Sequence, residues 1–270
     1  MLYSLIFIAI ISIVFIAGKA NLSIRFNKQV NELFTQSKSI SGKIFSYQQL
    51  AGLPEPVQKY FKLVLKEGQP YINYVRLKHD GKFKPGLDKE WVAIKGEQYF
   101  TTEKPGFIWK GKTSMFTARD SYIAEEGRLV VNILSLFKVA DGKGANYNQG
   151  ELLRWLAESV WFPTNLLPSE NVQWLPIDNL SAKLTFNYND LSLFFIVRFN
   201  NTGGIAEMET KRYLDEKKIS TWICKMEKYN EINGIFIPTE AEAFWRLEKG
   251  DFSYAKFNVK VVEYDKPQRF

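Results

Sequence analysis

Cysteine and histidine are almost absent from this 270-residue sequence, and their scarcity excludes several kinds of chemistry. The single cysteine, Cys224, cannot form an intramolecular disulfide or a thiolate metal cluster. We expect it to fill core space, because it alternates with Trp222 and Met226 and free cysteines are mostly buried. The single histidine, His79, is the one imidazole for any Ser-His, Cys-His or multi-histidine site. We expect it to be exposed in a turn at the end of a strand.

Motifs for catalysis and nucleotide binding are also missing. The stretch Asp141-Gly142-Lys143-Gly144 lacks the spacing and trailing Ser/Thr of a phosphate-binding loop, and no nucleophile elbow or calcium loop occurs. Carboxylate pairs do occur on candidate strands and turns. They are Glu125 with Glu126, Glu207 with Glu209, and Glu240 with Glu242. Such pairs could support acid-base catalysis on a buried face, but a solvated face is the commoner arrangement, so we expect neither an enzyme nor a cofactor.

Charged side chains are absent from residues 1–18, which are mostly Leu, Ile, Val, Phe and Ala. A spanning helix needs about 20 apolar residues, with a lower limit near 17, so this run is just long enough. A cleaved signal peptide is the alternative, but the run has no basic residue before it, and Gly18-Lys19-Ala20 is a poor cleavage site. We therefore expect residues 1–18 to form an uncleaved transmembrane anchor, which makes the chain a single-pass cell-membrane protein.

Positive charge is concentrated beside this segment. Eight basic and two acidic residues lie between Lys19 and Lys66, so this stretch carries six of the seven net positive charges. It could attract anionic lipid at about 1 kcal/mol per residue, or it could be a solvated linker, and both interpretations stay open. The positive-inside rule would keep the main domain in the cytoplasm, whereas the resemblance described below favours the other side, so its side is left open. No basic groove pattern favours nucleic acid.

Residues 19–68 are expected to form a basic linker that ends in a short amphipathic helix. Pro54 and Pro56 suit a first helical turn, and Gly68 suits the residue after the last turn. The apolar residues between them recur at helical spacing: Val57, Tyr60, Phe61, Val64 and Leu65. We expect this stripe to pack on a sheet and the intervening lysines to face water.

Residues 69–270 change to the alternating pattern of β-strands. The candidate strands cover residues 71–79, 91–100, 106–112, 120–125, 128–139, 182–188, 191–199, 205–212, 219–229, 235–247 and 252–264. Turn signals lie at Glu126-Gly127, Asn189-Asp190, Gly203-Gly204, Asn233-Gly234 and Lys249-Gly250. Because the connections are short, we expect a mainly β (α+β) domain: an antiparallel meander of about ten strands that forms a curved sheet or unclosed barrel.

One helix, near residues 148–162, interrupts this pattern. Leu152, Leu153, Leu156 and Val160 form its apolar stripe. Its charged residues are spaced for ion pairs between successive turns: Glu151, Arg154 and Glu158. We expect the helix to cross one mouth or face of the curved sheet, because the concave side needs a cover.

Aromatic side chains are abundant, at 15% of the chain. In a curved meander they can fill the interior or line a cavity for an apolar ligand, and small barrels are usually filled. Our site hypothesis assigns ligand binding to one aromatic wall and to the charged residues beside it. These candidate residues are Trp109, Trp155, Trp161, Arg154 and Glu158.

Several stretches resemble a bacterial family of membrane-anchored proteins whose domain has no known function. The stretches are Leu53–Phe61, Pro105–Trp109, Gly150–Glu158, Trp161–Thr164 and Gly250–Tyr254. The resemblance spans most of residues 50–265 and implies no activity. Pro105–Trp109 and Tyr229–Pro238 are also similar to the periplasmic lipoprotein carriers and related sorting proteins. That resemblance implies an unclosed barrel that holds acyl chains, with the helix around Arg154–Trp161 as its lid.

The leading hypothesis is a membrane-tethered half-barrel that binds an apolar or lipidic ligand. The alternative is a structural or partner-binding envelope protein with a filled core, whose protein partner the sequence does not identify. An enzyme that uses paired carboxylates is the third hypothesis. A spanning helix departs from the soluble or lipid-anchored state usual in such carriers, which argues against shuttling.

Overall fold

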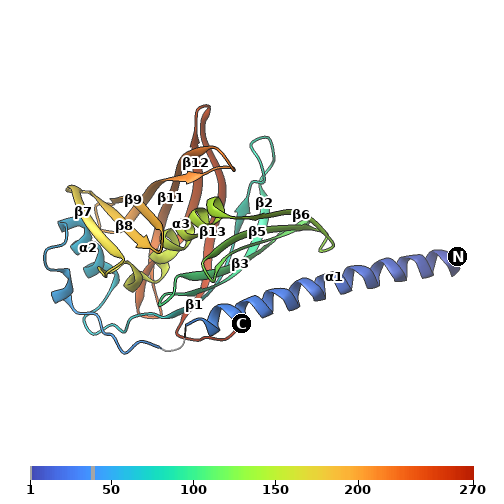
Figure 1. The fold of residues 1–270 in the computed structure, drawn as a ribbon, viewed down its shortest axis with the longest axis horizontal. Helices are drawn as coiled ribbons and strands as arrows, with labels where there is room; N and C mark the ends of the chain where they lie inside the picture. Colours follow the sequence, from blue (N-terminus) through green and yellow to red (C-terminus); the bar gives the residue numbers. More distant parts are fainter. Residues whose placement is uncertain (1, 38–39) are drawn as a thin grey trace.

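A computed structural model describes residues 2–37 and 40–270, and within them one sheet of thirteen antiparallel strands dominates the fold (Figure 1). This confirms the predicted unclosed antiparallel sheet. The strands are β1 (Tyr74–Phe83), β2 (Val92–Thr101), β3 (Gly106–Lys112), β4 (Phe116–Ile123), β5 (Glu126–Ile133), β6 (Phe137–Lys143), β7 (Val172–Asp178), β8 (Ser181–Tyr188), β9 (Leu191–Phe199), β10 (Ile205–Tyr213), β11 (Ile219–Ile232), β12 (Ile235–Leu247) and β13 (Gly250–Tyr264).

The sheet is a meander whose first and last strands pair at its centre. Its order is β6-β5-β4-β3-β2-β1-β13-β12-β11-β10-β9-β8-β7, so β6 and β7 are the two edges. The chain passes from one edge to the other through α3 (Ala145–Glu158), η2 (Ser159–Trp161) and η3 (Pro163–Leu166). Because this connection joins opposite edges, α3 crosses the concave side of the sheet, as predicted (Figure 1).

The structure has more strands than predicted. Residues 128–139 were expected to form one strand, but they belong to the hairpin β5–β6, which turns at Leu134 and Ser135 with φ of 51° and 60°. Strand β7 was not predicted, since it is short and largely exposed. The expectation that His79 is exposed in a turn was wrong: it lies inside β1, and only 3% of its surface is accessible.

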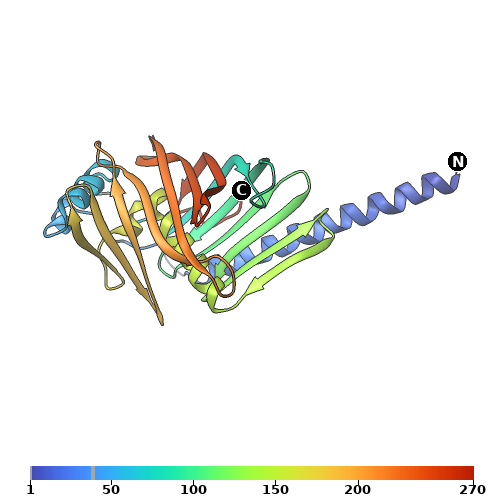
Figure 2. The ribbon, with the colours of Figure 1, turned by 90° about the horizontal axis from the view of Figure 1, so that it is seen from above.

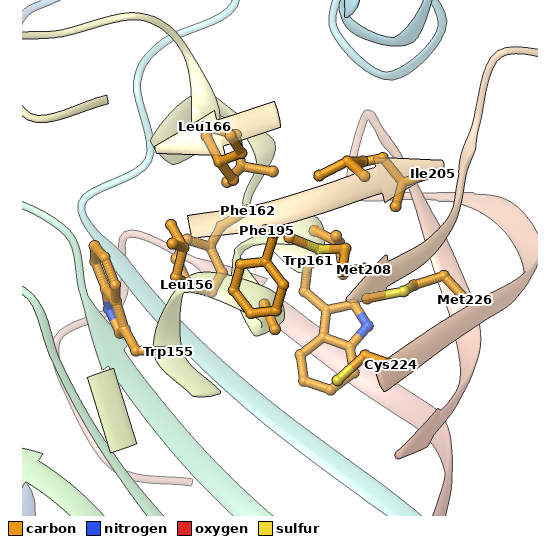
Figure 3. Close-up of a cluster of buried hydrophobic side chains, with 14 of the residues drawn as sticks. Trp155, Leu156, Trp161, Phe162, Leu166, Phe195, Ile205, Met208, Cys224 and Met226 are labelled. Atoms are coloured by element: carbon orange, nitrogen blue, oxygen red, sulfur yellow. The ribbon is translucent and has the colours of Figure 1, made fainter. Parts of the chain in front are cut away.

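The main hydrophobic core lies between the concave face of the sheet and the helices that cover it. Figure 3 shows part of it, with Trp155, Leu156 and Phe162 from the α3 region and Met208 and Met226 from strands. A second helix, α2 (Glu55–Val64), follows the short helix η1 (Tyr47–Leu50). All five apolar residues predicted to face the core from this helix region, including Leu65 just beyond α2, are buried.

Helix α1 (Leu2–Thr35) is long and has two halves with different surroundings. Residues 3–14 are exposed, and the helix is long and apolar enough to cross a membrane as an anchor or to serve as a signal sequence. The second half packs against Tyr74, Tyr99, Ile108 and Ile123 of the sheet. It does so through a stripe of buried side chains: Phe26, Val30, Leu33 and Phe34. The expected linker therefore begins with a continuation of the helix to Thr35. Met1 of the predicted anchor, and Lys38 and Ser39 of the predicted linker, lie outside the described residues.

Candidate functional site

Helix α3 is buried on two faces, because it lies inside the curved sheet and not on its surface. Every residue from Gly150 to Ala157 is buried. Leu152, Leu153 and Leu156 point into the core cluster. Glu151, Arg154 and Glu158 recur at i, i+3 and i+7, so they share the other face of the helix. This second face of α3 forms one side of a cavity.

The cavity lies between α3 and both halves of the sheet and has a volume of about 530 Å³. That volume falls within the range of about 300–1,000 Å³ that is usual for small-molecule sites. Its apolar wall comes mainly from strands β1–β5 and β11–β13. The largest side chains on this wall are Phe83, Trp109, Phe116, Trp222, Trp245, Tyr254 and Phe257, with Trp161 from η2. Small residues such as Ala118, Ala243 and Ala255 leave the space between them open.

Seven charged residues line the cavity, and five of them lie together on α3 and the strands that face it: Asp120, Glu151, Arg154, Glu158 and Arg212. We call them the charged cluster. Arg154 is its centre: its Nη1 donates to Asp120, and its Nε donates to Glu158 Oε1 at 3.0 Å. Arg212 Nη2 lies 3.6 Å from Glu151 Oε1. Gln98 donates to the second oxygen of Glu158 at 2.6 Å.

The arginines of the charged cluster also lie over aromatic rings of the wall. The Arg154 guanidinium is 4.7 Å from the centre of the Trp109 ring, and that of Arg212 is 4.5 Å from the centre of the Trp222 ring. A cation over an aromatic face contributes about 0.5–2 kcal/mol. The polar and apolar parts of the cavity are therefore held together by direct contacts.

Burial shifts the pKa values of the charged cluster. It raises the pKa of Glu151 to about 8, and the nearby charge of Asp120 adds to this effect. Burial also raises the pKa values of Asp120 and Glu158, against the charge of Arg154. Burial opposes the charge on Arg154, but Glu158 and Asp120 outweigh it and raise its pKa. When Glu151 is protonated, two carboxylates balance two guanidiniums.

Three polar atoms of the charged cluster are buried and have no hydrogen-bond partner among the described residues. They are Asp120 Oδ1, Glu151 Oε2 and Arg154 Nη2. An unpaired buried polar group costs about 1–3 kcal/mol, so such atoms favour a partner that the protein itself does not provide.

A buried histidine supports the aromatic wall. Trp109 Nε1 donates to His79 Nε2 at 2.8 Å, so the imidazole accepts there and is neutral. Burial lowers the pKa of His79 to about 4, which keeps it neutral at neutral pH. Glycines on β2 and β3 make room for both rings. A Cβ at Gly96 would lie 1.8 Å from His79 Nε2, and one at Gly111 would lie 2.2 Å from the Trp109 ring.

Four of the five candidate site residues line the cavity: Trp109, Arg154, Glu158 and Trp161. Trp155 does not, which corrects its place in the predicted aromatic wall. It follows Arg154 by one residue and so points about 100° away around the helix. Its indole donates to Thr101 O at 3.0 Å, and its ring packs against Phe186. Figure 3 shows it apart from Trp161.

Sequence reasoning missed Asp120 and Arg212, which complete the charged cluster. The alternation of side chains along a strand could have identified them. Asp120 lies two residues from buried Ala118 and Tyr122, and Arg212 lies two residues from buried Thr210. A charged residue in phase with an inward face is expected to be buried and paired.

Of the six carboxylates in the pairs noted in the sequence, Glu242 lines the cavity and the other five do not. Glu207 and Glu209 both pair with Arg198, Glu240 pairs with Lys228, and Glu242 pairs with Lys256. Within residues 2–37 and 40–270, no group of three or more His, Cys, Asp or Glu side chains is placed to hold a metal ion. Cys224 is buried, as expected, and its sulfur lines the cavity wall.

Comparisons with known proteins identify a family. A model of a family of unknown function, DUF6544, matches residues 43–257. No curated protein matches the chain. A LolA superfamily protein from Nitrosomonas europaea has a TM-score of 0.44 and 9% identity, over 78% of this chain and 92% of its own. A domain of an inferred outer membrane lipoprotein-sorting protein from Vibrio parahaemolyticus has a TM-score of 0.41 and 8% identity, over 73% and 87%. The family match confirms the resemblance to a family of unknown function that was proposed from the sequence.

Proposed function

Because this chain belongs to DUF6544, a family of unknown function, we propose its function from its own cavity: it is a membrane-anchored protein that binds an apolar or lipidic ligand inside the half-barrel. The observation that carries the proposal is a cavity of about 530 Å³ with an aromatic wall. A core that served structure alone would be filled at native packing density. An open, largely apolar space of this size therefore favours a ligand over the alternative of a purely structural or partner-binding protein.

The charged cluster supports an amphiphilic ligand. Apolar chains would lie against Trp109, Phe116 and Trp222, while a polar group would lie near Arg154 and Glu151. The unpaired oxygens and the unpaired Arg154 Nη2 offer both acceptors and a donor to such a group. We assign Trp109, Trp161, Arg154 and Glu158 to this site, with Asp120, Glu151 and Arg212.

We further propose that α1 stays attached as a single-pass anchor in the cell membrane. Its second half is docked on the sheet through Phe26 and Phe34, whose rings lie 6.1 Å and 5.7 Å from that of Tyr99. The anchor would hold the cavity close to lipids, which are the most abundant amphiphiles in a membrane.

Cavity-filling variants test the proposal. Ala118→Phe and Ala243→Phe place a ring in the open space, so both should fold and lose binding of a fluorescent fatty acid analogue. Ala182→Phe is the matched buried control, because Ala182 is fully buried and lies outside the cavity, so that substitution should destabilise the protein. The exposed substitution Ala145→Phe should change neither property.

A series of alkyl ligands gives a second measurement. Each added methylene should strengthen binding by about 0.8 kcal/mol, or about fourfold in Kd, until the chain outgrows the cavity. Equal affinities along the series would contradict the proposal, and so would unimpaired binding by both cavity-filling variants.

One observation favours catalysis as the second candidate function. Glu151, with its pKa raised to about 8, and Asp120 both line the cavity, and a protonated carboxyl beside an ionised one can serve as a general acid. We propose binding without catalysis as the better account, since Arg154 and Arg212 occupy these carboxylates in ion pairs. Recovery of chemically altered lipid after incubation, lost in Glu151→Gln, would favour the enzyme instead.

A further inference from the structure

We propose that the tip of the β5–β6 hairpin is a second membrane contact, which sets the open end of the cavity against the lipid bilayer. This inference rests on the proposed function only in taking α1 as the membrane anchor. The partner that contacts this surface is the interfacial layer of the bilayer that α1 crosses.

The surface is a patch of exposed apolar side chains at one end of the sheet. We call it the hairpin patch: Met115, Ile133, Leu134, Phe137 and Val139. These side chains are between 41% and 62% exposed, although they are large and apolar. The β3–β4 and β5–β6 turns are bonded to each other, since Leu134 N donates to Met115 O at 3.1 Å. A contiguous exposed patch of this kind marks an interaction site.

The hairpin patch lies where α1 leaves the sheet. Gly18 of α1 approaches the β5–β6 turn so closely that a Cβ there would lie 2.8 Å from Ser135 O and 2.6 Å from the Leu136 side chain. Figures 1 and 2 both show the tip of the β5–β6 hairpin beside the middle of α1. The uncharged, exposed half of α1 starts at this contact and runs away from the domain. A bilayer around that half would therefore meet the hairpin patch.

The direction of α1 relative to the sheet is fixed by packing. Phe26, Val30, Leu33 and Phe34 are buried against the sheet, and Lys110 Nζ lies 3.9 Å from the centre of the Phe26 ring. Gly18 and the β4–β5 turn lie at opposite ends of this docked half, because Gln36 accepts from Ala124 N at 3.1 Å. The intervening 18 residues span about 27 Å. One end of the sheet thus reaches the membrane while the other stays about 27 Å away.

The residues of the β5–β6 turn support a role for its exposed side chains in membrane contact. Leu134 and Ser135 both have positive φ, a conformation that favours Asn and Gly. The β11–β12 turn at the other end of the sheet has that favoured pair, Asn233-Gly234. A leucine at a disfavoured φ, with its side chain in solvent, has no folding benefit of its own. Contact with lipid would give it one.

The hairpin patch is continuous with the cavity. Ile133 and Val139 belong to both, and Phe116 of the adjoining β4 also lines the cavity. Phe83 and Pro85 line the cavity at the same end of the sheet, because β1 ends where β4 and β6 begin. A ligand could therefore pass between bilayer and cavity along apolar surface. The ligand class that this geometry selects is a membrane lipid.

Site-specific fluorescence in the full-length chain tests the inference. In a Cys224→Ala background, Leu134→Cys or Phe137→Cys carries an environment-sensitive fluorophore, and the protein is reconstituted in phosphatidylcholine–phosphatidylglycerol vesicles. Glu125→Cys is the matched control, since Glu125 is an exposed turn residue with φ of 67° at the distant end of the sheet. We expect a blue shift and quenching by spin-labelled lipid at 134 and 137, and neither at 125.

Two variants distinguish the membrane contact of the hairpin from that of the anchor. Gly18→Val removes the close approach to Ser135 and should weaken quenching at 134 while the chain still floats with vesicles. Leu134→Asp with Phe137→Asp should also float, but should take up lipid from vesicles at least about tenfold more slowly. Its affinity for a fatty acid added in detergent should be unchanged.

The outcomes distinguish the two proposals. An unquenched label at 134 in a chain that floats with vesicles would overturn the membrane contact and leave the ligand-binding proposal intact. Quenching at 134 in a chain that never binds lipid would support the membrane contact and overturn the ligand-binding proposal. Equal quenching at 134 and 125 would also overturn the membrane contact.

Discussion

Replacing Arg154 by methionine should destabilise the protein strongly, because this side chain neutralises two buried carboxylates at once. Its Nη1 bonds Asp120 and its Nε bonds Glu158, and side-chain exposures at these three residues are only 11%, 17% and 12%. Removing one partner of a buried ion pair costs about 3–5 kcal/mol, since the other charge is left unpaired. For a domain of this size that loss corresponds to a fall in Tm of roughly 10 °C.

The companion variant replaces all three partners, as Asp120→Asn, Arg154→Met and Glu158→Gln together. It leaves the Arg212–Glu151 ion pair as the remaining pair of the charged cluster, so its free energy of unfolding should lie within about 2 kcal/mol of the wild type. The destabilisation of Arg154→Met alone should shrink as the pH falls. Without the guanidinium, the pKa values of Asp120 and Glu158 rise further, and protonation at low pH removes the unpaired charges.

Urea unfolding of the full chain in detergent, followed by tryptophan fluorescence at about pH 5 and about pH 8, measures these differences. The wild-type and triple variants serve as controls for the extrapolation. A loss below about 1 kcal/mol for Arg154→Met at the higher pH would refute the reasoning. So would a triple variant that is no more stable than the single one.

Four further predictions follow from the site and the anchor. Burial lowers the pKa of His79 from its ordinary 6.5 to about 4. The contribution of the neutral imidazole to the free energy of unfolding is therefore complete above pH 6.5. On the order of 3 kcal/mol should be lost as the pH falls toward 4, and His79→Gln should flatten this slope in pH-dependent unfolding. Glu151 changes stability with pH in the opposite direction, because its pKa is raised from 4.5 to about 8. Stability should therefore fall as the pH rises through that window, by a few kcal/mol as an order of magnitude, and Glu151→Gln should remove the fall. Gly96→Ala should lower the free energy of unfolding by about 1–3 kcal/mol, because its Cβ meets the His79 ring, and thermal melts would show it. Intact mass measured from membranes should match the whole chain, and a mass starting after Ala20 would identify a signal peptide.

Much of the fold follows from local sequence pattern. Strand β3 covers residues 106–112, as predicted, and β9 covers 191–199. Asn189 and the Asn233-Gly234 pair adopt the positive φ that their turns require. These regions were predictable because side-chain alternation and turn chemistry there agree.

Other turns could not be predicted, because their sequence has no turn chemistry. The β5–β6 turn uses Leu134 and Ser135. The β4–β5 turn uses Ala124 and Glu125, whereas Gly127, the expected turn residue, lies within β5. Gly127 is needed for a different reason: a Cβ there would lie 2.2 Å from Tyr147 O of α3. Such a requirement is set by tertiary packing and is invisible in the local sequence.

Only the part of the site that depends on local sequence spacing was predictable. Arg154 and Glu158 were identified from their helical spacing, and they do form an ion pair. The partners from strands, Asp120 and Arg212, depend on which strands face α3, and this is decided by the sheet order. Trp155 was misassigned because composition alone cannot distinguish two buried faces of one helix.

Native mass spectrometry of the full chain extracted from membranes tests the central claim most directly. The account predicts a bound lipid at one copy per chain in the wild type and in Ala145→Phe, and its loss in Ala118→Phe and Ala243→Phe while these stay folded. Wild-type protein that carries no lipid under any gentle extraction, or cavity-filling variants that retain it, would contradict the account.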